Sequence, residues 1–254
     1  MRLARIAPPL ALLLLALAGW QLGVRLGDVD PATLPAPSAV GRALWAQRTL
    51  LAEHAWVTVQ EILVGYALAA ALGVGLALLV AASPLVERTV YPWLVVSQTI
   101  PIVAIAPVLV LWTGFDLRPK VIVIALVSFF PIAVNTVDGL KATDPELLDL
   151  LRTLGAGRWR RLRIARLPSA LPFVFSGLKV AAALAVIGAV FGEWVGADAG
   201  LGYLVLTFNN QLATAEMFAT IAVLAALGIA LFGLVALLER LLVPWRAAAR
   251  DRRR

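Results

Sequence analysis

Residues 119–138 read "PKVIVIALVSFFPIAVNTVD", an apolar run whose only charges, Lys120 and Asp138, stand near its ends. A helix of about 20 apolar residues crosses the ~30 Å hydrocarbon core of a bilayer. The whole chain is 61% hydrophobic and has a mean hydropathy of +0.91. A water-soluble fold of 254 residues could not bury so much apolar surface. The sequence therefore predicts an integral membrane protein.

Six segments are long and apolar enough to cross a membrane. They lie at about 7–24, 57–81, 90–112, 119–138, 169–192 and 217–238. We therefore predict an all-α polytopic membrane protein with one transmembrane domain over residues 1–254. The first segment also resembles a signal peptide, because Arg2 and Arg5 precede an apolar run and "ALA" at 16–18 resembles a cleavage site. The apolar spans that follow favour a first membrane helix instead.

The distribution of basic residues predicts the orientation, because cytoplasmic loops carry an excess of Lys and Arg. With both termini in the cytoplasm, the inner segments hold Arg2, Arg5, Arg88, Lys141, Arg152, Arg158, Arg160, Arg161, Arg163, Arg166, Arg240, Arg246, Arg250, Arg252, Arg253 and Arg254. The outer segments hold Arg25, Arg42, Arg48, Arg118 and Lys120, and Lys179 falls inside the fifth span. We therefore predict a multi-pass membrane protein with cytoplasmic N- and C-termini. Loop 139–168 is then cytoplasmic, where its arginines lie near anionic lipid headgroups.

This cytoplasmic loop contains a short helix whose start and end are both visible in "DPELLDLLRTLG" (144–155). Asp144 is a typical N-cap, and Pro145 suits the first helical position. Gly155 stands where a left-handed C-terminal cap is expected. The leucines that share one face are Leu147, Leu150, Leu151 and Leu154. A helix of about ten residues is marginal alone in water, so this face must bury against the membrane, the protein's own spans or a partner.

Two stretches on the outer side are not spans. Residues 27–56 begin in turns and continue as a helix capped at Ser38, which lies at the outer interface. Residues 193–216 form an outer loop that contains glycines. The single histidine of the chain, His54, is expected to be an interface residue rather than a ligand or a base.

The loop residues resemble a known family, the permease subunits of ABC-type importers. Their cytoplasmic loop carries a Glu-Ala-Ala triplet, then a glycine, then an Ile-x-Leu-Pro end. In this chain Gly155 matches the glycine, and Leu167 and Pro168 match the end. The departures are Asp149 in the Glu position, Leu150 and Leu151 in the Ala positions, and Ala165 in the Ile position. Only the acidic character of the triplet is kept.

Other stretches extend this resemblance over nearly the whole chain. Those that resemble the nitrate/sulfonate/taurine-type branch are "LPAPSAVGRALW" (34–45), "QTIPIVAIAPVLVLWTG" (98–114) and "GLGYLV" (200–205). Within that branch, residues 129–156 and 176–197 are most similar to permeases for thiamine-pyrimidine precursors (hydroxymethylpyrimidine) or for riboflavin. Sulfonates, taurine and nitrate stay open as alternative solutes.

The resemblance implies a type I ABC importer permease fold, in a bacterial inner membrane, with a coupling helix between spans four and five. In such permeases this helix docks on a cytoplasmic ATPase subunit, and closure of two ATPases swings the spans between inward- and outward-open states. An extracytoplasmic solute-binding protein delivers the solute, and a second permease copy, here a homodimer, completes the conduit. The docking residues expected in this chain are Asp144, Leu147, Asp149, Leu150, Leu151, Arg152, Leu154, Gly155, Arg158 and Trp159.

Polar residues inside the spans mark either a solute pathway or contacts between helices. The candidates for the pathway in spans three to five are Gln98, Thr99, Asn135, Thr136, Glu193 and Trp194. Pro101, Pro107 and Pro131 are expected to loosen the local helix geometry. For any single one of these polar residues, a structural hydrogen bond is the plainer interpretation.

Several function classes are excluded. No G-x-x-x-x-G-K-[ST], H-E-x-x-H or G-x-S-x-G motif occurs. We therefore expect a non-catalytic subunit with no cofactor and no metal. Cysteine is absent, and the net charge of +7 reflects the cytoplasmic arginines rather than a nucleic-acid partner.

The rival class is an ion-coupled secondary carrier. Such carriers usually bury ionisable groups near the membrane midplane. The ionisable residues in or beside the spans are Glu61, Asp138, Lys179 and Glu193. They form no obvious midplane relay, and Lys179 could extend toward the cytoplasmic headgroups.

Overall fold

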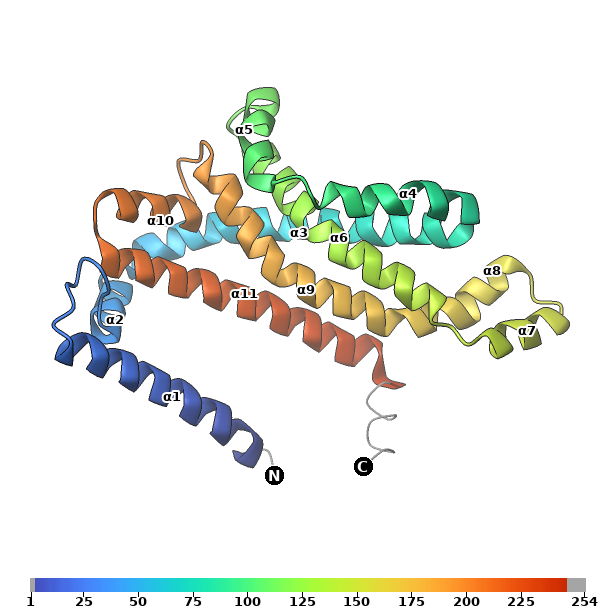
Figure 1. Ribbon diagram of the computed structural model, residues 1–254, viewed down its shortest axis with the longest axis horizontal. Helices are drawn as coiled ribbons and strands as arrows, with labels where there is room; N and C mark the ends of the chain where they lie inside the picture. Colours follow the sequence, from blue (N-terminus) through green and yellow to red (C-terminus); the bar gives the residue numbers. More distant parts are fainter. Residues whose placement is uncertain (1–2, 246–254) are drawn as a thin grey trace. The chain divides into compact units, whose positions relative to one another are not determined.

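The computed structural model describes residues 3–245, and every regular element among them is a helix (Figure 1). The helices are α1 (Leu3–Leu26), α2 (Pro37–Ala46), α3 (Arg48–Ala82), α4 (Pro84–Ser97), α5 (Ile102–Thr113), α6 (Leu117–Lys141), α7 (Pro145–Thr153), α8 (Arg158–Arg161), η1 (Leu162–Arg166), α9 (Leu167–Trp194), α10 (Leu201–Asn210) and α11 (Thr214–Leu242). The all-α prediction is confirmed. Some arginines used to predict the orientation lie outside the described residues: Arg2, Arg246, Arg250, Arg252, Arg253 and Arg254.

Five helical segments are long and apolar enough to cross a membrane. They are Ala7–Leu26, Arg48–Ala82, Leu117–Lys141, Arg158–Trp194 and Thr214–Leu242. A sixth crossing results if the bent pair Leu85–Ser97 and Ile102–Thr113 counts as one broken span. The prediction of a polytopic helical protein with about six spans therefore agrees with the structure.

The segment expected to be one span over 90–112 is divided. Helices α4 and α5 are separated by residues 98–101 and meet at an angle of 97°. The amides of Gln98 and Thr99 donate to carbonyls only three residues back, at Val95 and Val96. Pro101 then has no amide hydrogen and disfavours a helical conformation in the residue before it. The helix therefore stops, and α5 starts afresh with Pro101 as its N-cap.

The fifth span begins earlier than the expected residue 169. Helix α8 and the π-helical turn η1 run directly into α9, so one apolar helical segment covers Arg158–Trp194. Within the turn the amide of Leu167 donates to the carbonyl of Leu162, five residues back. Pro168 follows at the start of α9 and has no amide hydrogen, which favours a local adjustment of the helical bonding.

The outer segments also differ in detail from their expectation. Helix α2 starts at Pro37 with Ala36 as its N-cap, so Ser38 is not the cap. The backbone amide of Ser38 instead donates to Gln21 Oε1 at 3.0 Å. The loop expected over 193–216 contains helix α10, which follows Gly200 in a conformation with φ of 117°. Glycine adopts such a φ readily because it has no Cβ.

The chain forms two compact units. One comprises Met1–Thr58 and Asp198–Ala225, and the other comprises Val59–Ala197 and Ala226–Arg254. In the first unit, Thr214 Oγ1 donates to the carbonyl of Ala32 at 2.6 Å. The Trp20 and Phe218 rings lie 5.9 Å apart in the same unit. The expectation of one transmembrane domain stays a prediction.

In the second unit, glycines of α3 pack directly on α6. A Cβ added at Gly65 would lie 2.6 Å from Ile124 Cβ, and one added at Gly73 would lie 3.0 Å from Ile132 Cβ. Both positions advance by eight residues, so the two helices run parallel. Ala69, fully buried between the two glycines, continues the row. Small residues at every fourth position allow close approach of membrane helices.

Helix α9 packs against α6 in the opposite direction. Gly177 lies beside Pro131, Gly188 beside Ile124 and Gly192 beside Lys120. Residue numbers rise along α9 while those of its neighbours on α6 fall, so the two helices are antiparallel. A Cβ at Gly177 would lie only 2.7 Å from the carbonyl oxygen of Pro131. Helix α6 is therefore enclosed by small residues on both sides, which explains how it buries Ser128 and Thr136.

Candidate functional site

Helix α7 has the start predicted from its sequence. The Asp144 carboxylate accepts a hydrogen bond from the Glu146 amide at 2.9 Å, and Pro145 occupies the first turn. An aspartate cap satisfies an amide that has no partner inside the helix. The carboxylate of Glu146 in the first turn adds a favourable charge at the positive end of the helix dipole.

The end of α7 also has the predicted left-handed glycine, because Gly155 has φ of 74°. The Gly155 amide donates to the carbonyl of Arg152 at 3.0 Å, and the Ala156 amide donates to that of Leu151 at 2.9 Å. These two bonds are the pattern of a Schellman C-cap. The direction in which the chain leaves α7 is therefore fixed.

The apolar face of α7 is largely uncovered within the described chain, although Leu151 is partly buried. Leu147 is 40% exposed, Leu150 56% and Leu154 70%, and Trp159 beyond the helix is also exposed. Asp149 and Arg152 pair with each other at 3.6 Å on the exposed side. An amphipathic helix that leaves leucines uncovered has apolar area available for a partner or for the membrane interface.

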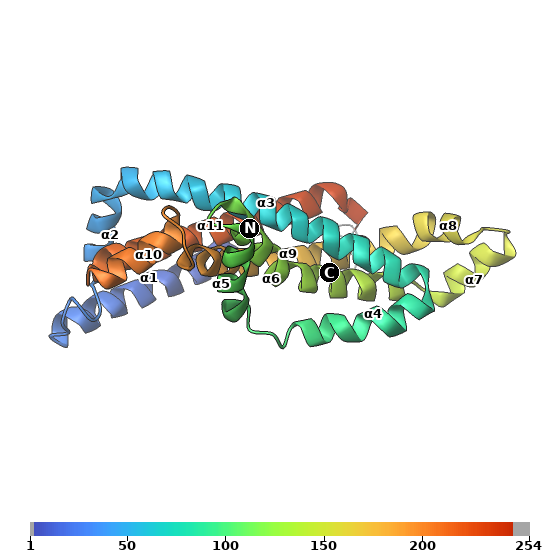
Figure 2. The same cartoon turned by 90° about the horizontal axis from the view of Figure 1, so that it is seen from above.

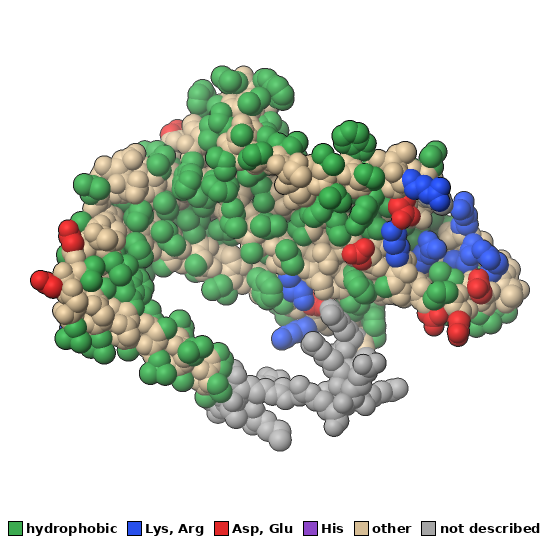
Figure 3. All heavy atoms as spheres, viewed as in Figure 1, with side chains coloured by type: hydrophobic (Ala, Val, Ile, Leu, Met, Phe, Trp, Pro, Cys, Tyr) green, Lys and Arg blue, Asp and Glu red, His purple; other side chains and the backbone are tan. Residues whose placement is uncertain are grey.

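Basic side chains gather around this helix. Figure 3 shows Lys and Arg side chains over α8 and the adjacent end of α4, and Asp and Glu side chains near α7. The exposed arginines of this region include Arg88, Arg158, Arg160 and Arg163. The cytoplasmic location of the loop stays a prediction, which rests on these same basic residues.

The candidate pathway residues lie at three places in the second unit. Gln98 and Thr99 are exposed at the break between α4 and α5. Asn135 and Thr136 lie on α6, where Asn135 Nδ2 donates to the Pro131 carbonyl and Thr136 Oγ1 to that of Ile132. These bonds within α6 agree with the structural interpretation of both residues.

The third place is the outer end of α9. The Glu193 side chain is buried, with 1% exposure. Trp194 is partly exposed and meets Phe191 edge to face, with the ring centroids 5.5 Å apart. Both residues make further interactions, so they are part of the packed end of the helix.

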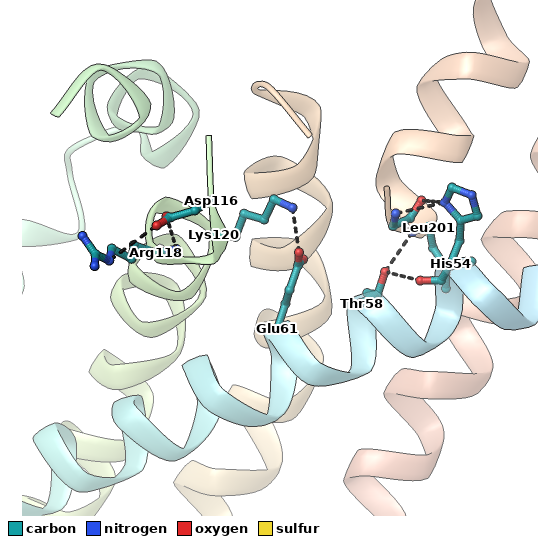
Figure 4. Close-up of polar contacts among 8 residues, drawn as sticks. His54, Thr58, Glu61, Asp116, Arg118, Lys120 and Leu201 are labelled. Carbon is teal, nitrogen blue, oxygen red and sulfur yellow. Dashed lines mark hydrogen bonds and ion pairs between the residues drawn. The ribbon is translucent and has the colours of Figure 1, made fainter. Parts of the chain in front are cut away.

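Sequence reasoning missed a buried ion pair between α3 and α6. Lys120 Nζ lies 2.8 Å from Glu61 Oε1, and their side chains are 9% and 1% exposed (Figure 4). Lys120, which is expected at the outer border, also packs against Gly192 of α9. One feature of the sequence points to this pair: Glu61 and Lys120 carry opposite charges, and each lies near the start of its expected span.

A second pair joins α9 to α11. Lys179 Nζ lies 2.6 Å from Glu239 Oε2, with side chains 21% and 12% exposed. Lys179 therefore pairs with a carboxylate and does not extend alone to the headgroups. Charges inside membrane segments are costly unless they are paired.

His54 has a structural role in the first unit. Its Nδ1 accepts a hydrogen bond from the Gly200 amide at 3.0 Å, and its ring stacks on Tyr203. Thr58 Oγ1 accepts from the Leu201 amide at 2.8 Å (Figure 4). The two side chains thus cap α10, which has no cap of its own. No cluster of three or more metal-ligating side chains occurs in the part of the chain that the structure describes.

Comparison with known proteins gives consistent matches. The model of the family described as "Binding-protein-dependent transport system inner membrane component" matches residues 69–245. The chain is 41% identical over 239 residues to the formylaminopyrimidine transport permease protein of Halalkalibacterium halodurans, covering 94% of this chain and 95% of that protein. It is 39% identical over 238 residues to the riboflavin transport system permease protein of Chloroflexus aurantiacus, covering 93% and 89%.

The fold has a solved counterpart. An inward-facing chain of the MetNI methionine ABC transporter superposes with a TM-score of 0.57 over 75% of this chain and 98% of that chain, at 19% identity. At this identity the likeness concerns the fold alone.

Proposed function

This chain belongs to the family of binding-protein-dependent transport system inner membrane components, and on that premise we propose that α7 is the helix through which an ATPase subunit drives it. Membership makes it the non-catalytic, multi-pass inner-membrane subunit of an ABC importer, whose partners are an ATPase and a binding protein. What supports the proposal is one observation: α7 is capped at both ends while its leucine face is uncovered. A helix with fixed ends can transmit a displacement, which a flexible loop would absorb.

Replacing Gly155 with valine tests the docking assignment. A side chain has space there, since nothing lies within 4 Å of an added Cβ, but φ is +74°. A left-handed conformation costs an L-residue about 1–2 kcal/mol, so the end of α7 will shift. We expect the affinity for the cognate ATPase, measured with both proteins in detergent, to fall by about tenfold.

The matched control is Gly157→Val. Gly157 also has open space around an added Cβ, but its φ of −64° suits any residue. This variant should bind the ATPase as the unmodified chain does. Equal binding and equal ATP hydrolysis by the two variants would show that the docking assignment is wrong.

For the solute, we propose a thiamine-pyrimidine precursor or a related heterocycle. Support comes from the two relatives whose names state formylaminopyrimidine and riboflavin. Sulfonates, taurine and nitrate are the alternatives from the same branch. Since the binding protein exercises most of the selectivity in such importers, the permease carries few substrate signals.

Calorimetry on the cognate binding protein decides among these solutes. The panel is formylaminopyrimidine, hydroxymethylpyrimidine, riboflavin, an aliphatic sulfonate, taurine and nitrate. We expect a pyrimidine to bind at least about a hundredfold more tightly than the sulfonate, because a site built for ring hydrogen bonds leaves polar groups unpaired with the wrong ligand. Tightest binding of the sulfonate would contradict the proposal.

We further propose a homodimer of this chain with two ATPases and with both termini in the cytoplasm. The exposed basic cluster around α7 and α8 supports this orientation. The ion-coupled carrier is disfavoured because Glu61 and Lys179 are each already paired with an opposite charge. Uptake that continues without ATP and stops when the proton gradient collapses would favour that rival.

A further inference from the structure

A contiguous set of contacts joins α7 to the break between α4 and α5 within the second unit. We propose that Lys141 and Glu87 are positioning residues for transport: they pass a displacement of α7 to α4 and so to residues 98–101. This inference rests on the proposed docking of an ATPase on α7. It names the route by which that docking reaches the candidate pathway residues Gln98 and Thr99.

The link from α7 to Lys141 is short, and each of its residues is held by a hydrogen bond or by burial. Lys141 ends α6, and only residues 142–144 precede α7. The Ala142 amide donates to the carbonyl of Asp138 at 2.9 Å. Thr143 is buried, and Asp144 caps α7. A displaced α7 will therefore move the last turn of α6 with it, because the three linking residues are all held by these contacts.

Lys141 in turn holds the first turns of α4. Its Nζ lies 2.6 Å from Glu87 Oε1 and 5.6 Å from the centre of the Tyr91 ring. These two residues are four apart and so lie on one face of α4. The start of α4, the end of α6 and α7 lie toward the same end of the second unit (Figures 1 and 2), and the ion pair joins the first two of them.

Apolar packing holds α4 near the end of α6 and α5 near the start of α6. Near the end of α6, Val137 forms a buried cluster with Ala77 and Val80 of α3, and Val86 and Val90 of α4 pack against this cluster. Near its start, Val123 packs with Ala106 and Leu109 of α5. The two α6 anchors are about 20 Å apart along the helix. Any movement of α4 relative to α5 is therefore concentrated in the four residues between them.

The ion pair is suited to a positional role because it contributes little to stability. Its side chains are 50% and 39% exposed, and exposed ion pairs are weak. Removing it should leave the fold intact while loosening the connection of α6 to α4. Function and folding can then be separated experimentally.

The absence of cysteine from the chain allows a readout that needs no transported solute. Ile100 lies in the break and is 53% exposed. The variant Ile100→Cys, labelled with an environment-sensitive dye, reports changes at the break when ATP is added to the complex with the ATPase. We expect an ATP-dependent change in emission in this labelled parent.

Charge reversal then tests the pair. Lys141→Glu and Glu87→Lys should each reduce the ATP-dependent change by about threefold, while the ATPase still binds and the unfolding temperature stays within error. The double variant Glu87→Lys/Lys141→Glu should recover most of the change. Recovery will be partial, because each reversed charge opposes its helix dipole.

Arg118→Glu is the control. Arg118 forms a more exposed pair with Asp116 at 3.5 Å, at the other end of α6 (Figure 4), and its reversal should leave the dye signal unchanged. An unchanged signal in both single reversals of Lys141 and Glu87, or no recovery in the double variant, would overturn the proposal. Loss of ATPase binding by Lys141→Glu would also overturn it, because Lys141 would then belong to the docking surface. Failure of the docking proposal itself is seen separately, in the Gly155→Val comparison.

Discussion

Replacing Lys120 with alanine is expected to lower the free energy of unfolding by about 3–5 kcal/mol, the usual cost of breaking a buried ion pair. The Glu61 side chain, which is 1% exposed, would lose the cation that pairs with it. Its second oxygen, Oε2, has no hydrogen-bond partner among the described residues, so no neighbour there replaces the ammonium group. Equilibrium unfolding of the purified protein in detergent measures this loss.

The double variant Glu61→Leu/Lys120→Met separates the pair from its packing. Replacing a buried ion pair by apolar residues of similar volume is often neutral or stabilising. The double variant should therefore be more stable than Lys120→Ala by roughly 3 kcal/mol. If the two are equally unstable, the pair is not the reason for the loss.

The second large effect is expected at Gly177, where even alanine should destabilise the α6–α9 packing. An added Cβ would lie 2.7 Å from the Pro131 carbonyl oxygen and 3.0 Å from Ile132 Cα. Both are backbone atoms, so the two helices must separate. Overpacking of this kind costs about 1–3 kcal/mol, which the same unfolding measurement on Gly177→Ala detects.

Gly233→Ala should have the opposite sign. Gly233 lies inside α11, and nothing approaches an added Cβ within 4 Å. Alanine in an open helical position is favoured over glycine by about 0.5–1 kcal/mol. A destabilisation of the same size in both variants would mean that helix contact at Gly177 is not the cause.

Local features of the fold could be predicted from the sequence because their causes are local. The ends of α7 follow from Asp144 and Gly155, which act within a few residues of themselves. The break at Pro101 is less predictable, because Pro92 and Pro107 lie inside helices that continue. What distinguishes Pro101 is the tightened turn at Gln98 and Thr99 before it.

Non-local contacts could not be predicted in the same way. Glu61 and Lys120 are near the starts of two spans, but they meet only because α3 and α6 run parallel in one register. That register depends on Gly65 and Gly73 facing isoleucines of α6. Regularly spaced glycines indicate that another helix packs closely on this one. They do not show which helix it is. The sequence therefore indicated charges and small residues without indicating which helices they join.

The two buried ion pairs have an electrical consequence. Moving one elementary charge across a membrane potential of 100 mV involves about 2.3 kcal/mol. Glu61 with Lys120, and Lys179 with Glu239, each place equal and opposite charge within 3 Å. If each pair moves as a unit when the spans rearrange, it carries no gating charge. Neither pair then couples the conformational cycle to the membrane voltage, in keeping with an importer that is driven by ATP.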